Sequence, residues 1–467
     1  MSHSFNIRGL GGVFMLALAG CAQVPRYAAP IVQTPTTYKE AGPWIMAQPD
    51  DSAARGKWWA IFGDPQLDAL ETRLNKDNPS LAAADARYAQ ALAVAGQARS
   101  GLLPAITVNA DASRNRLAAG HPLGQGNSLT YTERDIGTAF GYEVDLWGRV
   151  HANLAAARAD AQASAGDVAA ARLLLQAQLA TIYFALRGDD EALALYARTV
   201  DSYARAYALT QTRHEGGIAS GIDVNRAQTQ LATAKAQRDA VFADRAVLEH
   251  TLAVLTGVPP SALTLSPVKY IAGLPDVPVS APSTLLQRRP DIAAAERRVY
   301  AANARIGVAR AALFPQVTLG GSAGFQTVSG ALLTAPNTFW ALGPASALAT
   351  LFDNGKRRAA IAQARAQFDE ASANYRETVL GAFRDVEDAL ARLRWLAAQT
   401  QDQSEAVRGA NATLDLALFR YRSGAADYIE VTTAQTDSLN AERALVTLHV
   451  QQAQARVDLV RALGGGL

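Results

Sequence analysis

The chain of 467 residues is 49% hydrophobic and 18% charged, so it can bury a large core and is not typical of disordered proteins. Its 44 Lys and Arg against 42 Asp and Glu give a net charge of +2, without the basic clusters that follow a phosphate backbone, which argues against a nucleic-acid partner. A single cysteine excludes an internal disulfide framework and a cysteine-based zinc cluster. The histidines lack the i, i+4 pairing of a helical metal site, so neither a metal nor another cofactor is expected.

Residues 1–20 have the features of a signal peptide, with Arg8 before a short apolar run. The sole cysteine, Cys21, follows Leu18-Ala19-Gly20, and this stretch resembles the lipobox of bacterial lipoproteins. The resemblance implies that Cys21 becomes a lipidated N-terminus carrying palmitate; the alternative is an ordinary signal peptide with a coincidental cysteine. Ala22 after the cysteine favours the outer membrane by the same resemblance. We expect no later segment to be apolar for long enough to form a transmembrane helix, so strands are expected to cross any membrane.

The chain after Cys21 contains a tandem duplication. Residues 78–108 align without a gap to residues 289–319 at an offset of 211, with matched Pro, Gly and Arg as well as Ala. From Gly148 to Gly257 the offset is 207 throughout, which indicates a span of fixed length. We therefore expect an N-terminal extension at 21–65, a first repeat at 66–260, a linker at 261–284 and a second repeat at 285–467.

Each repeat is expected to consist mainly of long helices. The proline-free stretch from Gly148 to Gly217 has apolar residues at helical spacing and predicts one helix about 100 Å long. Shorter helices are predicted at 79–102 and 223–256. Gly217 and Gly424 lie in the tip turns, where they supply the positive φ that a helix-ending turn needs.

Between the helices the apolar pattern changes to period two, which predicts strands. A β-hairpin is expected at about 104–146 in the first repeat and at about 315–351 in the second. Four strands cannot close a barrel in hydrocarbon, where an open sheet edge is not tolerated. The sequence therefore predicts a transmembrane β-barrel that is shared between chains.

Several motifs identify a family that the chain resembles. They include "WWAIFGDPQLDAL" (58–70), "EVDLWGR" (143–149), "LLQRRPDI" (285–292) and "YRSGAADYIEVTTAQ" (421–435). Their order and spacing resemble the TolC-type outer-membrane efflux proteins, in particular the lipidated OprM-like branch. The resemblance implies a mainly α fold with a β-barrel part: a homotrimer with a 12-stranded barrel in the outer membrane and a periplasmic α-barrel of helical hairpins. It also implies no enzymatic activity, and passive exit of small molecules such as drugs from an inner-membrane pump and a periplasmic adaptor.

The same resemblance implies a periplasmic gate formed by four residues near the tips of the helical hairpins. Asp223 and Tyr421 match an acid and a tyrosine that hydrogen-bond across the closed mouth of the family's tunnel, and a carboxylate with a phenol makes a reversible link. Glu430, which the offset of 207 pairs with Asp223, matches an acidic lumen position. Thr433 stands where a second acid is common, so a double acidic ring is not supported. Asp223 can equally serve as the N-terminal cap of the returning helix.

Two other classes of protein are weaker alternatives. Gly320-Gly321-Ser322-Ala323-Gly324 fits the G-x-S-x-G pattern of hydrolases, but strand-like alternation runs through it and no helix follows directly. A periplasmic helical scaffold or adaptor lipoprotein without a channel would explain the long helices, yet it has no use for two hairpins with an apolar face.

Overall fold

The computed structural model of the chain describes residues 24–33, 35, 37–40, 56–120, 128–268 and 288–465. The predicted signal peptide, Cys21 and part of the linker at 261–284 lie outside the described residues. The chain divides into two compact units. Unit 1 comprises residues 1–31, 87–165 and 294–376, and unit 2 comprises residues 32–86, 166–293 and 377–467.

The helices occur in pairs of equal length, as the duplication predicts. The two longest have 67 residues each, the returning helices have 35 each, and the helices before the strands have 22 each. These pairs are α4 (Arg149–Glu215) with α8 (Lys356–Arg422), α5 (Gly221–Leu255) with α9 (Tyr428–Ala462), and α3 (Pro79–Ser100) with α7 (Pro290–Ala311). The other helices among the described residues are α2 (Pro65–Asp77) and the short 3-10 helices η2 (Trp58–Phe62), η4 (Pro260–Ala262) and η6 (Ala335–Asn337).

Matched glycines fix where these helices begin and end. Gly148, Gly217 and Gly257 have φ values of 72°, 76° and 75°, and their equivalents at 355, 424 and 464 have 85°, 78° and 89°. Residues with a side chain rarely adopt this left-handed backbone conformation. Both members of each equivalent pair are therefore glycine, and each lies at a helix boundary. At Gly257 a Cβ atom would also lie 2.2 Å from the carbonyl oxygen of Asp77.

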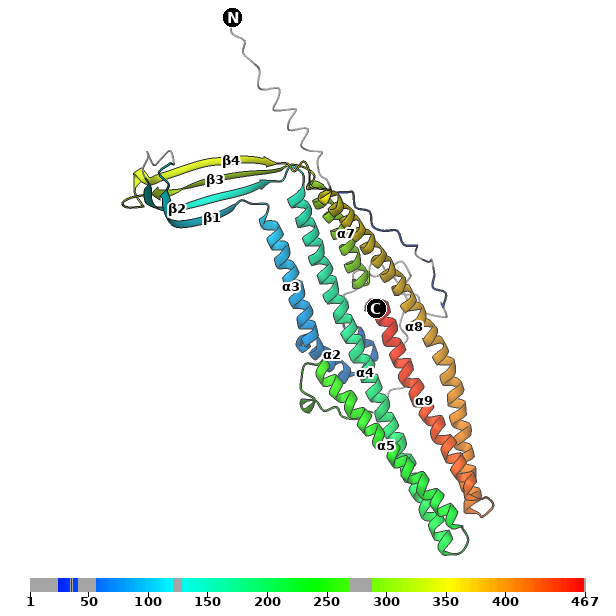
Figure 1. Ribbon diagram of the computed structural model, residues 1–467. Coiled ribbons are helices and arrows are strands. Elements are labelled where there is room, and N and C mark those ends of the chain that lie inside the picture. The colour runs from blue at the N-terminus through cyan, green and yellow to red at the C-terminus, as the bar shows by residue number, and fades with distance from the viewer. Residues whose placement is uncertain are drawn as a thin grey trace. The chain divides into compact units, whose positions relative to one another are not determined.

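The strands form one antiparallel sheet in unit 1, in the order β1-β2-β3-β4 (Figure 1). The bounds are Ala105–Leu117 for β1, Leu129–Val144 for β2, Gln316–Thr327 for β3 and Thr338–Leu348 for β4. Each predicted hairpin therefore forms, and the pairing of β2 with β3 joins the two repeats. Within the described residues β1 and β4 each pair with a strand on one side only, so both edges of the sheet remain open to another chain.

The strand register places apolar and polar side chains on opposite faces of the sheet. Ile106 lies opposite Phe140, and Phe140 opposite Gly321, which in turn lies opposite Leu342. Ile106 and Leu342 are 74% and 82% exposed, so this apolar face is uncovered in the single chain. On the other face the Asn109 side chain donates to Asp135 Oδ2 at 3.0 Å. Such a sheet fits lipid on one side and water on the other.

The expectation that no helix after Cys21 could span a membrane is wrong for α4. Judged by length and composition alone, this helix is long and apolar enough to cross a membrane. One window of 18 residues in this helix has a mean hydropathy of 1.3, and 39% of the window is buried within the chain. An Ala- and Leu-rich helix that packs against neighbours on more than one side carries few charges, so it reaches this hydropathy without contact with lipid.

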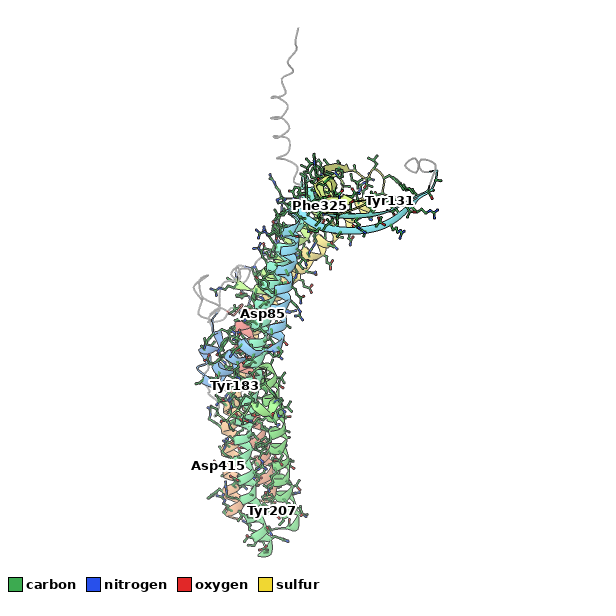
Figure 2. All side chains as sticks on the ribbon, turned by 90° about the vertical axis from the view of Figure 1, so that its left-hand side faces the viewer. Asp85, Tyr131, Tyr183, Tyr207, Phe325 and Asp415 are labelled. Carbon is green, nitrogen blue, oxygen red and sulfur yellow. The ribbon has the colours of Figure 1, made fainter. Side chains whose placement is uncertain are left out.

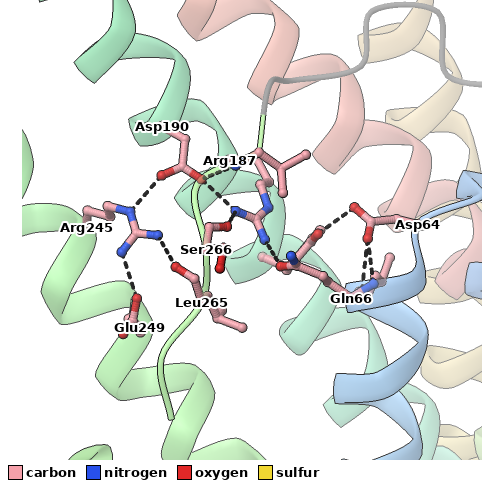
Figure 3. A network of polar contacts seen from close by, with 11 residues as sticks. Asp64, Gln66, Arg187, Asp190, Arg245, Glu249, Leu265 and Ser266 are labelled. Atoms are coloured by element: carbon pink, nitrogen blue, oxygen red, sulfur yellow. Dashed lines mark hydrogen bonds and ion pairs between the residues drawn. The ribbon is translucent and has the colours of Figure 1, made fainter.

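A buried polar network ties three segments of unit 2 together (Figure 3). Asp190 on α4 accepts from Arg187 Nη1 at 2.6 Å and from Arg245 Nε on α5 at 2.6 Å. Arg187 also donates to the Ser266 carbonyl at 3.0 Å and to the Gln66 side chain, and Arg245 Nη2 donates to the Leu265 carbonyl at 2.7 Å. The network therefore fixes α2 and the chain after η4 against the long hairpin.

Glu71 on α2 is a buried acid that the network does not include. Its side chain is fully buried, and neither carboxyl oxygen has a hydrogen-bond partner among the described residues. Burial, with a smaller contribution from Asp68, raises the pKa of Glu71 to about 9. Glu71 is therefore neutral at pH 7 in the folded chain.

We expect the replacement Glu71→Gln to flatten the pH dependence of stability. The folded state binds one more proton than the unfolded state between pH 4.5 and 9, so wild-type stability falls as pH rises through this window. The loss reaches roughly 3 kcal/mol at pH 7. Thermal unfolding of both proteins from pH 5 to 9 measures the difference, and parallel curves would contradict a neutral Glu71.

Candidate functional site at the helix tips

The first tip joins α4 to α5 and is stabilised by local bonds. Gly217 turns the chain, and the amides of Ile218 and Ala219 donate to the Arg213 carbonyl at 2.8 and 3.2 Å. Asp223 forms a capping box with Ser220: each side chain accepts from the other residue's amide, and Ser220 Oγ lies 2.8 Å from Asp223 Oδ2. The structure thus places Ser220 as the N-cap of α5 and Asp223 as the third residue of the helix, which completes the capping box.

The second tip joins α8 to α9 and uses an ion pair instead of a capping box. Arg420 Nη1 lies 3.1 Å from Glu430 Oε2, and Arg420 Nη2 donates to the Ala425 carbonyl at 3.2 Å across the turn at Gly424. Thr433 Oγ1 donates to the Ile429 carbonyl at 2.9 Å. Glu430 and Thr433 both line a groove of about 340 Å³ between α8 and α9.

The two tips pack on one another through small residues and two tyrosines. The buried cluster contains Ala206, Ala227, Ala417, Tyr421, Tyr428, Val431 and Ala434. Tyr207, which packs against it, is labelled near this end of the helices in Figure 2. The rings of Tyr421 and Tyr428 meet edge to face at 5.2 Å. Burial raises the pKa of Tyr428 well above its usual range, so its phenol stays neutral.

Tyr421 is held by groups on the first hairpin. It is 4% exposed, and its hydroxyl donates to Thr210 Oγ1 on α4 at 3.1 Å. Arg213 Nη1 donates to the Tyr421 carbonyl at 2.6 Å, and the Arg213 guanidinium lies 4.8 Å from the centre of the Tyr421 ring. Among the described residues no hydrogen bond joins Tyr421 to Asp223; the partners of Tyr421 on the first hairpin are Thr210 and Arg213.

The roles of Arg213 and Thr210 were not predicted from the sequence. The offset of 207 pairs Arg213 with Arg420, yet the two arginines make different contacts: Arg420 closes its own turn, and Arg213 reaches across to the other hairpin. The sequence does show a matched arginine four residues before each tip glycine, at Arg213 and Arg420. This spacing does not indicate which carbonyl group a long arginine side chain reaches.

Comparisons with known proteins agree with this architecture. The family described as "Outer membrane efflux protein" matches residues 72–258 and 281–465. The pyoverdine export outer membrane protein OpmQ of Pseudomonas aeruginosa is 32% identical over 97% of this chain and 95% of its own length. A solved membrane protein from Pseudomonas aeruginosa is 31% identical, with a TM-score of 0.86 over 95% of this chain and all of its own.

A third comparison concerns an open channel. The open state of the MtrE outer membrane channel of Neisseria gonorrhoeae is 29% identical, with a TM-score of 0.82 over 96% of this chain and 99% of its own. The duplicated helices, the four-stranded sheet and these matches over both repeats lead to one conclusion: the chain belongs to the outer membrane efflux protein family.

Proposed function

We propose that the protein is the outer-membrane exit channel of a tripartite efflux system and that it conducts small molecules such as drugs without catalysis. The observation that carries this proposal is the four-stranded sheet, which has an apolar face, a polar face and two open edges. A channel of this kind supplies no energy of its own. A pump in the inner membrane therefore has to deliver the substrate, through a periplasmic adaptor that docks on the helices.

The working unit is a homotrimer. Three copies of the sheet make a barrel of 12 strands, which removes every open edge, whereas one copy leaves the outer edges of β1 and β4 without a partner in lipid. The barrel lies in the outer membrane and the helices lie in the periplasm. Lipid on Cys21 would add a second attachment to the same membrane. The apolar run before Cys21 supports the removal of residues 1–20 as a signal peptide.

The gate belongs at the helix tips, with Asp223, Tyr421, Glu430 and Thr433 in the following roles. Tyr421 anchors the second hairpin to the first, and Asp223 shapes the first turn as a cap. The second carboxyl oxygen of Asp223, Oδ1, lies 3.9 Å from Arg226 Nη1 and remains within reach of a group on a docking partner. Glu430 and Thr433 line the groove between α8 and α9, where an adaptor or a neighbouring chain can bind.

We expect Tyr421→Phe and Asp223→Ala to increase the time that purified channels spend open in a planar bilayer. Tyr421→Phe removes the bond to Thr210, and Asp223→Ala removes the half of the capping box in which the Asp223 carboxylate accepts from Ser220. Thr212→Ala is the matched control, because its hydroxyl donates only to the Ala208 carbonyl of its own helix. Unchanged conductance in both variants would contradict the gate, while a monomer that never conducts would favour a helical scaffold.

A further inference from the structure

Three arginines of the first hairpin lie on the apolar face of the sheet, at the end that is far from the helices. Alternation along β1 places Arg114 and Arg116 on the same face as Ile106. Arg134 on β2, the strand beside β1 in Figure 1, pairs with Ala112 and so lies on this face as well. All three arginines are exposed. These three residues form the arginine cluster.

The acids at the same end of this hairpin belong to the opposite, polar face. Asp135 pairs with Asp111 in the strand register, and its Oδ2 accepts from the Asn109 side chain at 3.0 Å. Glu133 accepts from the Gln326 side chain on β3. The first hairpin therefore separates its charges, with acids on the polar face and arginines on the apolar face.

The arginine cluster carries its positive charges close together without an acid to balance them. Arg114 and Arg116 are two residues apart on one strand, a separation of about 7 Å, and Arg134 is the diagonal neighbour of Arg114 at about 7–8 Å. Arg116 Nη2 donates to Ser128 Oγ at 3.4 Å, whereas Arg114 and Arg134 form no ion pair with another described residue. Like charges at this spacing repel one another, so an anion between them would be bound favourably.

The length of β1 places the arginine cluster where hydrocarbon gives way to lipid headgroups. Arg114 is nine residues after Ala105, the first residue of β1. At a rise of about 3.4 Å per residue and a tilt of about 40°, this length covers about 23 Å of membrane, close to the height of a barrel's apolar band. The proposed function places the helices in the periplasm, so the cluster lies at the outer leaflet.

The second hairpin reaches the same depth without any charge. Residues 315–351 contain no Asp, Glu, Lys or Arg, and the residue of β3 that pairs with Arg134 is Thr327. A threonine hydroxyl is therefore polar enough for a strand at this depth. The need for a polar strand end does not explain why the first hairpin has three arginines on its apolar face.

We propose that the arginine cluster binds the phosphate groups of an anionic lipid in the outer leaflet, with one such site on each chain. Guanidinium groups pair with phosphate oxygens in a bidentate geometry. The acyl chains of the same lipid would cover apolar side chains below the cluster, such as Val108, which is 72% exposed. This proposal rests on the proposed function, which puts the sheet in the outer membrane, and it adds a ligand, its leaflet and the residues that hold it.

Lipid binding to the purified trimer of the full chain tests the site. Native mass spectrometry in detergent measures the dissociation constants of diphosphorylated lipid A and of phosphatidylcholine, whose headgroup has no net charge. We expect Arg114→Gln, Arg116→Gln and Arg134→Gln each to weaken lipid A binding about fivefold, and the triple variant to weaken it about a hundredfold. Phosphatidylcholine should bind all of these variants as it binds the wild type.

Two control variants separate the site from a general effect of charge. Lysine at all three positions should retain most of the lipid A binding, because it keeps the positive charge and loses only the bidentate geometry. Arg376→Gln removes an exposed arginine from α8, outside the sheet, and should leave lipid A binding at the wild-type value. Equal binding of lipid A by the wild type and the triple glutamine variant would overturn the site.

Recordings of the same proteins in a planar bilayer distinguish a failure of the lipid site from a failure of the channel. A conducting trimer that binds lipid A no better than phosphatidylcholine would contradict the lipid site and leave the proposed function intact, whereas a monomer without conductance would contradict the channel itself. If the arginines lined the lumen, the triple glutamine variant would shift the reversal potential in a salt gradient and keep its lipid binding. That result would also overturn the lipid site.

Discussion

Replacement of Asp190 by alanine is expected to lower the free energy of unfolding by about 3–5 kcal/mol. The Asp190 and Arg187 side chains are 2% and 3% exposed, and Asp190 is also the buried counter-charge of Arg245. Its removal leaves Arg187 without an anionic partner in a site that water does not reach. Arg245 keeps the carboxylate of Glu249, at 2.7 Å, and the Leu265 carbonyl, at 2.7 Å.

Denaturant unfolding of the detergent-solubilised protein, followed by far-ultraviolet circular dichroism, measures this loss. Asp239→Ala is the matched control, because it breaks an exposed pair with Arg238 on α5 and should cost less than about 1 kcal/mol. Equal effects of the two replacements would show that the network contributes no more than a surface ion pair.

Most of the fold could be predicted from the sequence because it depends on periodicity and on internal repetition. The helix predicted from Gly148 to Gly217 occupies residues 149–215, and the predicted hairpins occupy residues 105–144 and 316–348. Glycines that match at an offset of 207 lie at the helix boundaries, where a positive φ requires glycine whatever the neighbouring side chains are. Local patterns of this kind survive duplication even when most side chains change.

Long-range polar contacts could not be predicted in the same way. Arg187, Asp190 and Arg245 look like ordinary surface charges on long helices, and only the packing of α2 and the chain after η4 buries them. At the tips, the Tyr421 hydroxyl donates to Thr210 of the same chain, a contact that no motif indicates. Two chains with the same motif can differ here, because one changed side chain redirects a hydrogen bond without altering the helices.

Arg213→Ala is expected to open the channel more than any change at the equivalent Arg420. Arg213 joins the hairpins by a charge-assisted hydrogen bond of 2.6 Å to the Tyr421 carbonyl, near the negative end of α8, and by contact with the Tyr421 ring. Loss of about 1.5–3 kcal/mol of such binding favours the open state roughly tenfold to a hundredfold.

Arg420→Ala removes an arginine from the same depth of the other tip but breaks only contacts within its own hairpin. It should therefore change the open fraction little, which makes it the matched control for single-channel recordings. Arg213→Lys should lie between wild type and Arg213→Ala, because it keeps the charge near the end of α8 but loses the planar group over the tyrosine ring. If Arg420→Ala opened the channel as far as Arg213→Ala does, the cause would be lost positive charge at the mouth. A difference between them would assign the closed state to the bond between hairpins.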